Sequence, residues 1–276
     1  MNRWYLTRLV LVLVLSGCGH SGTRATVADS RTSPTATSNN LENSTPASTS
    51  SGSAATSAPV GSATSSPSTS QKPESTEEEK LPSGLVIRQS RVGGPAPGPE
   101  LPKGTTVLHI GDSFAGALGI ELNRTLEQAG VHGVLRFETS TYIPTWAYDK
   151  KLGQYLSQYK PDLILISLGA NELQNPEPEK RIPLIHHLIE RLGGRSCAWV
   201  APVLWEGAPS KLLDVIKANV APCIYLDGNS FVVHMPRARD KIHPSMDARP
   251  DWARVITRWL GYHRRPTAEN IWNLVE

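Results

Sequence analysis

The sequence has few aromatic residues, few cysteines and no long hydrophobic run beyond its first 17 residues. Aromatic residues make up 6% of the 276-residue chain and hydrophobic residues 39%, below the usual apolar share of a globular domain. No stretch after residue 17 approaches the ~20 apolar residues that a membrane-spanning helix needs. The formal charge of +3 falls to +1 (3 − 2) if Arg3 and Arg8 belong to a cleaved signal. Such a balance offers no basic surface for nucleic acid, so we expect no nucleic-acid partner.

Signatures of bound metals and phosphates are also missing. His, Cys, Asp and Glu do not cluster at the spacings that metal ligands adopt. No glycine-rich loop of the phosphate-binding kind is present. The sequence therefore predicts neither a metal site nor a cofactor.

Residues 1–17 are predicted to be an export signal. Arg3 and Arg8 precede an apolar run over residues 9–15, which is the order found in secretory signals. The run leads into Leu-Ser-Gly-Cys at residues 15–18, which resembles the lipobox of bacterial lipoproteins. The resemblance implies that Cys18 carries the acyl chains of a membrane anchor, since stable anchoring takes two of them. It places the protein in the cell envelope, on the outer membrane if there are two membranes; a plain cleaved signal is the alternative.

The next segment is predicted to be a long tether. Between residues 21 and 70 nearly every residue is Ser, Thr, Ala, Pro, Gly or Asn, so residues 18–80 cannot bury enough apolar surface to fold. Residues 81–104 are rich in Gly and Pro, and we expect an extended linker lying partly on the domain. A flexible chain of about 80 residues spans roughly 50 Å.

Strands alternate with helices over residues 105–265, ahead of a C-terminal tail at 266–276. Apolar runs predict five strands, at residues 106–110, 134–137, 163–168, 197–203 and 223–226. Helical spacing of apolar residues predicts five helices, at residues 117–129, 148–159, 182–192, 212–220 and 252–260. This alternation indicates a single α/β domain with a five-stranded parallel sheet, whose active site should lie at the carboxyl ends of the strands.

Two of these strand ends carry residues suited to acyl chemistry. The first strand runs into Asp112 and Ser113 at the start of a helix, where a hydroxyl nucleophile and a free backbone N–H would lie together. The third strand ends before Asn171, whose side-chain amide can donate to a developing oxyanion. Alone, each residue is more often a cap or a turn residue.

A third group lies near the last helix. Asp240 and His243 are three residues apart, so the carboxylate can orient the imidazole and leave its other nitrogen to accept a serine proton. His234 is the second choice for the base, and Asp247 or Asp251 could replace Asp240. His109 lies inside the first strand and is expected to be a buried core residue. Asp112 is expected to hold the Ser113 turn through backbone N–H groups.

Together these segments resemble the SGNH/GDSL hydrolase family over about residues 105–260. The first family block matches Gly111-Asp112-Ser113-Phe114, the third matches Gly169-Ala170-Asn171-Glu172, and the fifth matches Asp240 through His243. The resemblance implies a flavodoxin-like three-layer α/β/α sandwich and ester hydrolysis through an acyl-enzyme. It makes Ser113 the nucleophile, His243 the general base and Asp240 its partner, with Asn171 and the Ser113 N–H in the oxyanion hole.

The sequence departs from the family at the second block. A glycine that gives a third oxyanion N–H should follow the second strand, and residues 138–146 contain none. The backbone N–H of Ser140 or Thr141 can take that role, because any residue except proline carries one. Their side chains would narrow the pocket and favour a small acyl group.

The substrate is expected to be an acylated, most simply O-acetylated, polysaccharide outside the cytoplasm. Three aromatic residues follow strand ends and could stack on sugar rings: Tyr142, Trp146 and Trp205. The same residues could also carry out O-acetyl transfer to an envelope glycan. A non-catalytic, glycan-binding surface lipoprotein is the alternative from another class.

The two cysteines other than Cys18 are predicted to form a disulfide. Cys197 and Cys223 each open a predicted strand, and one helical crossover joins the two strands. Such strands are usually neighbours, ~4.8 Å apart, which is within reach of a disulfide in an oxidising compartment. Two free buried cysteines are the alternative.

Overall fold

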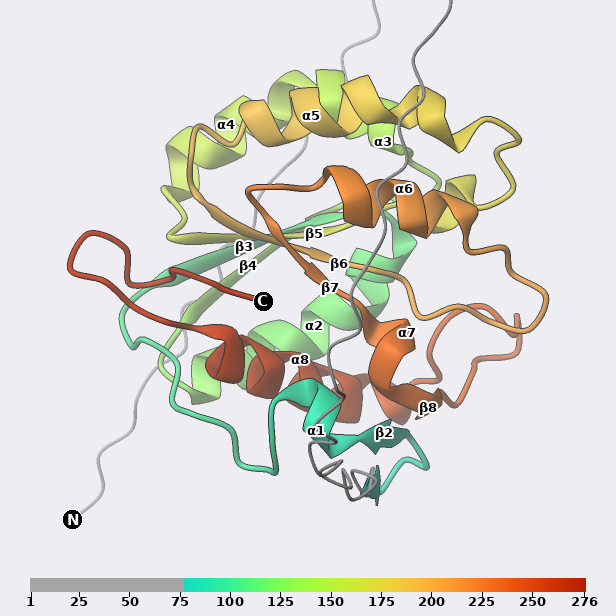
Figure 1. Cartoon of the computed structure of the whole chain (residues 1–276). Helices are drawn as coiled ribbons and strands as arrows, with labels where there is room; N and C mark the ends of the chain where they lie inside the picture. Colours follow the sequence, from blue (N-terminus) through green and yellow to red (C-terminus); the bar gives the residue numbers. More distant parts are fainter. Residues whose placement is uncertain (1–76) are drawn as a thin grey trace, which may run out of the picture. The chain divides into compact units, whose positions relative to one another are not determined.

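The structure is a computed structural model that describes residues 77–276. Its centre is a parallel sheet of five strands in the order β4-β3-β5-β6-β7 (Figure 1). The strands are β3 (Thr106–Gly111), β4 (His132–Phe137), β5 (Leu163–Ser167), β6 (Ser196–Val200) and β7 (Ile224–Leu226). Numbered along the chain this order is 2-1-3-4-5, the flavodoxin-like arrangement, and the predicted α/β/α sandwich is confirmed.

Helices cover both faces of the sheet. Helices α3 (Ile143–Tyr148), α4 (Lys150–Tyr159), α5 (Ile182–Glu190) and α6 (Lys211–Asn219) form one outer layer, and α2 (Ser113–Gln128) and α8 (Ala248–His263) form the other (Figure 1). Side chains alternate between the layers. Along β3, Val107 packs in the core under α2 and α8, while Leu108 and Ile110 pack in the core under α3 to α6.

Two elements differ from the sequence prediction for local reasons. The helix expected over residues 148–159 is two helices, because Asp149 is extended and its carboxylate caps α4 through the N–H of Lys151. The strand expected over residues 197–203 ends at Val200, two residues before Pro202. No helix among residues 77–276 has the length and apolar character to cross a membrane.

The segment expected to be an extended linker is part of the domain. It forms β2 (Val86–Arg88) and α1 (Gln89–Val92), and it is preceded by β1 (Glu78–Lys80), which is formed by the last residues of the expected tether. Strand β2 pairs antiparallel with both β1 and β8 (Val232–His234), which follows the short helix α7 (Gly228–Phe231). The side chains of Leu85, Ile87 and Val92 are fully buried in the core under α2 and α8. The folded unit therefore starts well before residue 105.

The segment expected to be a C-terminal tail also packs on the domain. Trp272 is fully buried, and its indole N–H donates to the Thr105 hydroxyl at 3.0 Å. An isolated bridge between Arg264 and Leu274 closes the turn that brings Trp272 back to the sheet. Residues on both sides of the expected domain thus complete one of its two cores.

The predicted disulfide joins Cys197 and Cys223, with their Cα atoms 4.7 Å apart. It links the amino ends of β6 and β7, at the opposite end of the strands from Ser113. Both cysteines are buried in the core under α3 to α6.

Candidate active site

A chain of hydrogen bonds joins Ser113, His243 and Asp240. Nε2 of His243 lies 2.8 Å from Oγ of Ser113, and Nδ1 of the same ring lies 2.7 Å from Oδ2 of Asp240. The hydrogen bond to His243, with further bonds from the N–H groups of Ile242 and His243, lowers the pKa of Asp240 to about 2. Asp240 is therefore ionised at neutral pH and fixes the tautomer with the proton on Nδ1, which leaves Nε2 free to accept the serine proton.

Ser113 is the first residue of α2, directly after β3. The side chain of Asp112 caps the helix by accepting the N–H of Phe114 at 2.8 Å, as expected from the sequence. The N–H of Ser113 makes no hydrogen bond with any residue of the described segment. It lies at the positive end of a 16-residue helix, where a developing negative charge is stabilised.

Asp112 is fully buried, and its Oδ2 atom has no partner among residues 77–276. Burial raises the pKa of Asp112 to about 7, and the nearby charge of Glu172 acts in the same direction. A carboxyl group that titrates near neutral pH therefore lies one residue from Ser113.

The loop that carries Asp240 and His243 is held by Arg237. Its guanidinium donates to the carbonyl oxygen of Ile242 at 2.7 Å and to those of Val203 and Leu204 at 2.9 and 2.7 Å. One side chain thus ties this loop to the segment that follows β6.

Asn171 lies in a short 3-10 turn after β5, and its amide reaches the loop between β4 and α3. Nδ2 of Asn171 donates to the carbonyl oxygen of Thr141 at 2.9 Å, which leaves its second N–H for another acceptor. Ser140 has a φ of +58°, a left-handed conformation that glycine adopts at less cost. The N–H groups of Ser140 and Thr141 have no acceptor in the described part of the chain. A serine thus adopts the glycine-type conformation in the loop where the family resemblance predicted a glycine.

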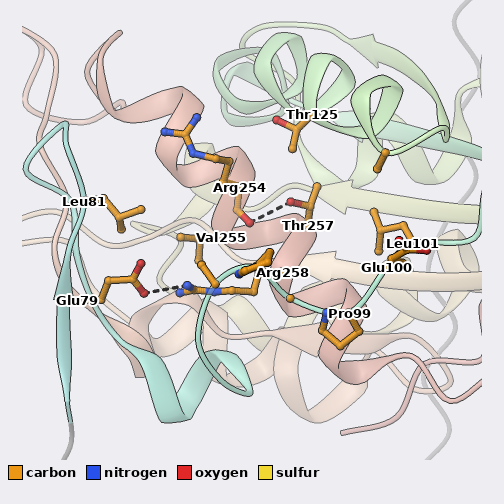
Figure 2. Close-up of a pocket in the computed structure, with 14 residues that line it drawn as sticks. Glu79, Leu81, Pro99, Glu100, Leu101, Thr125, Arg254, Val255, Thr257 and Arg258 are labelled. Atoms are coloured by element: carbon orange, nitrogen blue, oxygen red, sulfur yellow. Dashed lines mark hydrogen bonds and ion pairs between the residues drawn. The ribbon is translucent and has the colours of Figure 1, made fainter.

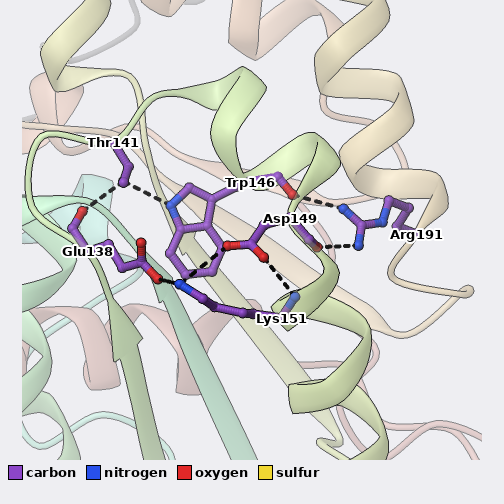
Figure 3. A network of polar contacts seen from close by, with 6 residues as sticks. All are labelled: Glu138, Thr141, Trp146, Asp149, Lys151 and Arg191. Atoms are coloured by element: carbon purple, nitrogen blue, oxygen red, sulfur yellow. Dashed lines mark hydrogen bonds and ion pairs between the residues drawn. The ribbon is translucent and has the colours of Figure 1, made fainter. Parts of the chain in front are cut away.

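The loop between β4 and α3 leads directly into α3, and hydrogen bonds hold α3 in place at both of its ends. At its start, the N–H of Ile143 donates to the buried carboxylate of Glu172 at 2.7 Å, and Arg181 pairs with the other oxygen of Glu172. At its end, Arg191 donates to the carbonyl oxygens of Trp146 and Asp149 at 3.0 and 2.6 Å (Figure 3), and to that of Ala147 at 2.6 Å.

The three aromatic residues singled out from the sequence have different surroundings. Trp146 is buried, and its indole N–H donates to Oγ1 of Thr141 at 3.0 Å, so it supports the loop and offers no face to a ligand (Figure 3). Its burial therefore does not support the predicted role in substrate binding. Tyr142 is 43% exposed beside this loop. Trp205 is half-buried and stacks on Phe114, with ring centroids 6.0 Å apart, and Phe114 in turn packs on His243 at 4.9 Å.

The alternative acids and base, Asp247, Asp251 and His234, make no hydrogen bond to the Ser113 hydroxyl or the His243 ring within residues 77–276, where those two groups bond each other and Asp240. Asp251 is buried and accepts the N–H of Ser83 while pairing with Arg254. His109 is buried as expected and bonds Ser167 at 2.9 Å, and burial lowers its pKa to about 3. His234 is exposed in β8, where it pairs with Val86 of β2.

Four residues of the site were missed by sequence reasoning: Phe114 as a packing partner of His243, and Arg181, Arg191 and Arg237 as anchors. The arginines bond carbonyl or carboxylate groups 5 to 45 residues away, so no local spacing marks them. Phe114 could have been recognised from the sequence as a neighbour of the site, because it directly follows Ser113. Within residues 77–276 no group of three His, Cys, Asp or Glu side chains could hold a metal ion.

Comparisons with known proteins yield distant structural similarities. No family model matches the chain, and no curated protein matches its sequence. An α/β hydrolase from the metagenome of Lake Arreo, Spain, is similar over 59% of this chain and 97% of its own, at 14% identity and a TM-score of 0.47. A family 3 carbohydrate esterase from Clostridium thermocellum is similar over 56% of this chain and 94% of its own, at 17% identity and a TM-score of 0.44.

The C-terminal catalytic domain of peptidoglycan O-acetyltransferase A from Streptococcus pneumoniae is also similar. It aligns over 58% of this chain and 94% of its own, at 19% identity and a TM-score of 0.43.

Proposed function

We propose that this protein is a serine ester hydrolase of the SGNH/GDSL type that works through an acyl-enzyme. The observation that carries the proposal is the hydrogen-bonded chain from Ser113 through His243 to Asp240, at 2.8 and 2.7 Å. An isolated surface His–Asp pair would not also contact a serine at the start of a helix. This arrangement activates a hydroxyl nucleophile.

In the first half of the reaction, Oγ of Ser113 attacks the ester carbonyl while Nε2 of His243 takes its proton. The charge on the imidazolium is stabilised by the ionised Asp240. When the tetrahedral intermediate collapses, the bond to the alcohol oxygen breaks and His243 returns the proton to the departing alcohol. The acyl group stays on Ser113.

In the second half, water replaces the alcohol. His243 takes a proton from the water, whose oxygen attacks the acyl carbonyl. Cleavage of the acyl bond to Ser113 releases the carboxylic acid and returns the proton to Oγ. The site is then ready for another ester.

The oxyanion of both intermediates needs donors on the side opposite His243. We assign the free N–H of Ser113 and the second amide N–H of Asn171 to this role. The third donor is the N–H of Ser140 or Thr141. Both lie in the loop to which Asn171 is hydrogen bonded, and both lack an acceptor among residues 77–276.

The substrate class follows from what surrounds these donors. Ser140 brings a side chain where a glycine would leave space, which favours a small acyl group such as acetyl, whereas the Thr141 hydroxyl is hydrogen bonded to Glu138 and Trp146. Tyr142 and Trp205 offer exposed and half-buried rings on which a sugar can stack. We therefore propose small O-acyl groups on a polysaccharide as the natural substrate.

A location outside the cytoplasm is part of the proposal. The disulfide between Cys197 and Cys223 supports it, because disulfides persist in oxidising compartments. The signal, Cys18 and most of the tether lie outside the described residues. Anchoring by lipid on Cys18 at the cell envelope thus rests on the sequence.

The test compares hydrolysis of p-nitrophenyl acetate, butyrate and octanoate by the wild type and by Ser113→Ala and His243→Ala. We expect acetate to be the best of the three and each variant to lose several orders of magnitude in turnover. Ser157→Ala and His186→Ala change exposed residues on other elements and should leave the rate unchanged. Turnover that persists in both site variants would refute the hydrolase proposal.

The natural substrate is tested by acetate release from a panel of O-acetylated polysaccharides. Adding a deacetylated glycan as acceptor distinguishes hydrolysis from transfer, because only transfer forms a new glycan ester. The same assay with Ser113→Ala measures the uncatalysed release of acetate, which is then subtracted from the release by the wild type. Absence of acetate release from every glycan, with rapid cleavage of small esters, would restrict the proposal to low-molecular-weight esters.

A further inference from the structure

A cavity of about 350 Å³ lies on the far side of the domain from the proposed active site. Its walls come from the segment between β1 and β3, from α8 and from the carboxyl end of α2 (Figure 2). Thr125 on its wall lies twelve residues after Ser113 along α2, which is about 18 Å at ~1.5 Å per residue. Neither Ser113 nor His243 lines it, so it is separate from the proposed acyl-transfer site.

Most of the cavity wall is apolar. Leu81, Leu101, Ala129 and Val255 contribute hydrocarbon surface from three different elements. A turn at residues 96–99, which contains two prolines, closes one side. Such a space suits a hydrocarbon chain, and at ~30 Å³ per water-sized group it holds about twelve such groups.

One charged group with unused donors lines this apolar space. The side chain of Arg258 is only 5% exposed, and its Nη1 donates to Oε2 of Glu79 at 2.8 Å. Its Nε and Nη2 atoms are buried and have no hydrogen-bond partner within residues 77–276. Buried donors left unpaired destabilise a folded protein, and those of a charged guanidinium do so more than neutral ones.

The unused donors form the edge of the guanidinium that fits a carboxylate. The N–H groups of Nε and Nη2 point in parallel, so the two oxygens of one carboxylate can accept both of them. Glu79 engages only Nη1 and leaves this edge free. We propose that the cavity binds a medium-chain aliphatic monocarboxylate, with its carboxylate on Arg258 and its chain among the apolar walls.

The other charges at the cavity do not compete for Arg258. Arg254 pairs with the buried Asp251, and Glu100 is exposed and faces Lys103 at 3.9 Å. The positive charge of Arg258 offsets the negative charge of Glu79. A carboxylate bound to Arg258 therefore meets no unpaired negative charge beside it within the described part of the protein. The proposal does not rest on the hydrolase activity.

The cavity is open to solvent on one side, but a ligand reaches the buried Nε and Nη2 atoms of Arg258 only if the wall moves. The turn at residues 96–99 lies directly on Arg258, since a Cβ atom on Gly98 would lie 2.8 Å from Cγ of Arg258. This turn belongs to neither a helix nor a strand, so it can shift without breaking a regular element.

The test is a titration of the full chain with sodium octanoate, followed by isothermal calorimetry and by ¹H–¹⁵N correlation spectra. We expect saturable binding, with spectral changes confined to residues near 81, 96–101, 125–129 and 254–258. 1-Octanol lacks the carboxylate and sodium acetate lacks the chain, so each should bind at least tenfold more weakly. Changes centred on Ser113 and His243 instead would place octanoate in the active site and overturn the proposal.

Two variants test the two halves of the cavity separately. Ala129→Leu fills the apolar part without touching Arg258, and Arg258→Lys keeps the charge but removes the paired donors. Each should weaken octanoate at least tenfold while p-nitrophenyl acetate hydrolysis stays within twofold of the wild type. Thermal melting checks that both variants are folded. Unchanged octanoate affinity in a folded Ala129→Leu protein, or octanol binding as well as octanoate, would overturn the proposal.

Discussion

The carboxylate of Glu172 and the backbone N–H of Ile143 form a buried hydrogen bond of 2.7 Å between residues 29 positions apart. Glu172 directly follows Asn171, and Ile143 begins α3 two residues after Thr141. The bond therefore fixes the spacing between the two segments that supply the proposed oxyanion donors. Arg181 holds the other oxygen of Glu172, so the carboxylate cannot rotate freely.

Glu172→Gln should lower kcat by roughly tenfold with little change in KM. The amide keeps the length of the side chain but loses the charge that Arg181 pairs with, which costs ~1–3 kcal/mol of stability in a buried site. Initial rates with p-nitrophenyl acetate and urea unfolding measure the two effects. Glu177→Gln, at an exposed pair with Lys180, is the control and should change neither. Equal rates for Glu172→Gln and the wild type would contradict the role given to this bond.

Arg237→Lys should lower kcat/KM by about 10- to 100-fold. An ammonium group cannot hold carbonyl oxygens on both loops as the guanidinium does, so the loop of Asp240 and His243 loses its tie to the segment after β6. Rates are measured well below the melting temperature of the variant, so that unfolding does not contribute. Arg239→Lys, at an exposed position in the same loop, should behave as the wild type.

Asp112 should make the protein less stable as the pH rises from about 4 to 7. Its folded-state pKa of about 7 lies above the ordinary value of 3.8, so in this range the folded protein holds a proton that the unfolded chain has lost. The loss is at most about 4 kcal/mol, at ~1.36 kcal/mol per pKa unit. Urea unfolding at pH 4.5 and 7.5 should show this fall for the wild type and a smaller one for Asp112→Asn. A fall of the same size in both would assign the effect to other groups.

Removing the disulfide should lower the stability by about 3 kcal/mol on the loop-entropy account, for a sequence separation of 26 residues. Cys197→Ser and Cys223→Ser should give similar losses, and the double variant should not add them. Unfolding is measured on protein exported to an oxidising compartment. Two free thiols in denatured, unreduced Cys18→Ser protein would show that the bond does not form.

Cys18 should carry fatty acid. Metabolic labelling with a fatty-acid analogue should mark the wild type and leave Cys18→Ser unlabelled and released from the membrane fraction. Cys197→Ser is the matched control and should remain labelled. Label on the Cys18→Ser protein would exclude the lipobox interpretation.

The alternation of strands and helices could be predicted from the sequence because each central strand is a short, continuous apolar run. The run at residues 163–168 is buried on both faces in the sheet, as its composition indicated. The order of Ser113, Asn171, Asp240 and His243 along the chain gave the candidate site for a similar reason. Each residue follows a strand or precedes the last helix, and parallel strands bring those positions to one edge.

The remaining features depend on contacts between distant residues. Strands β1 and β2 have three residues each and are stabilised by pairing with one another and with β8 near residue 233, so neither has a pattern of its own. Trp272 looked like part of a tail because its partner, Thr105, is 167 positions away. Trp146 was predicted to bind substrate because it follows a strand end. Its hydrogen bond to Thr141 cannot be inferred from their spacing in the sequence.

The burial of Trp272 bears on when this chain can fold during synthesis. The core under α2 and α8 contains this ring together with Leu85, Ile87 and residues of the central strands. Until residue 272 has left the ribosome, that core lacks one of its largest side chains and exposes apolar surface. We therefore expect the core under α2 and α8 to close only after the segment around Trp272 has been synthesised, which suits the export through a membrane that we propose for this protein.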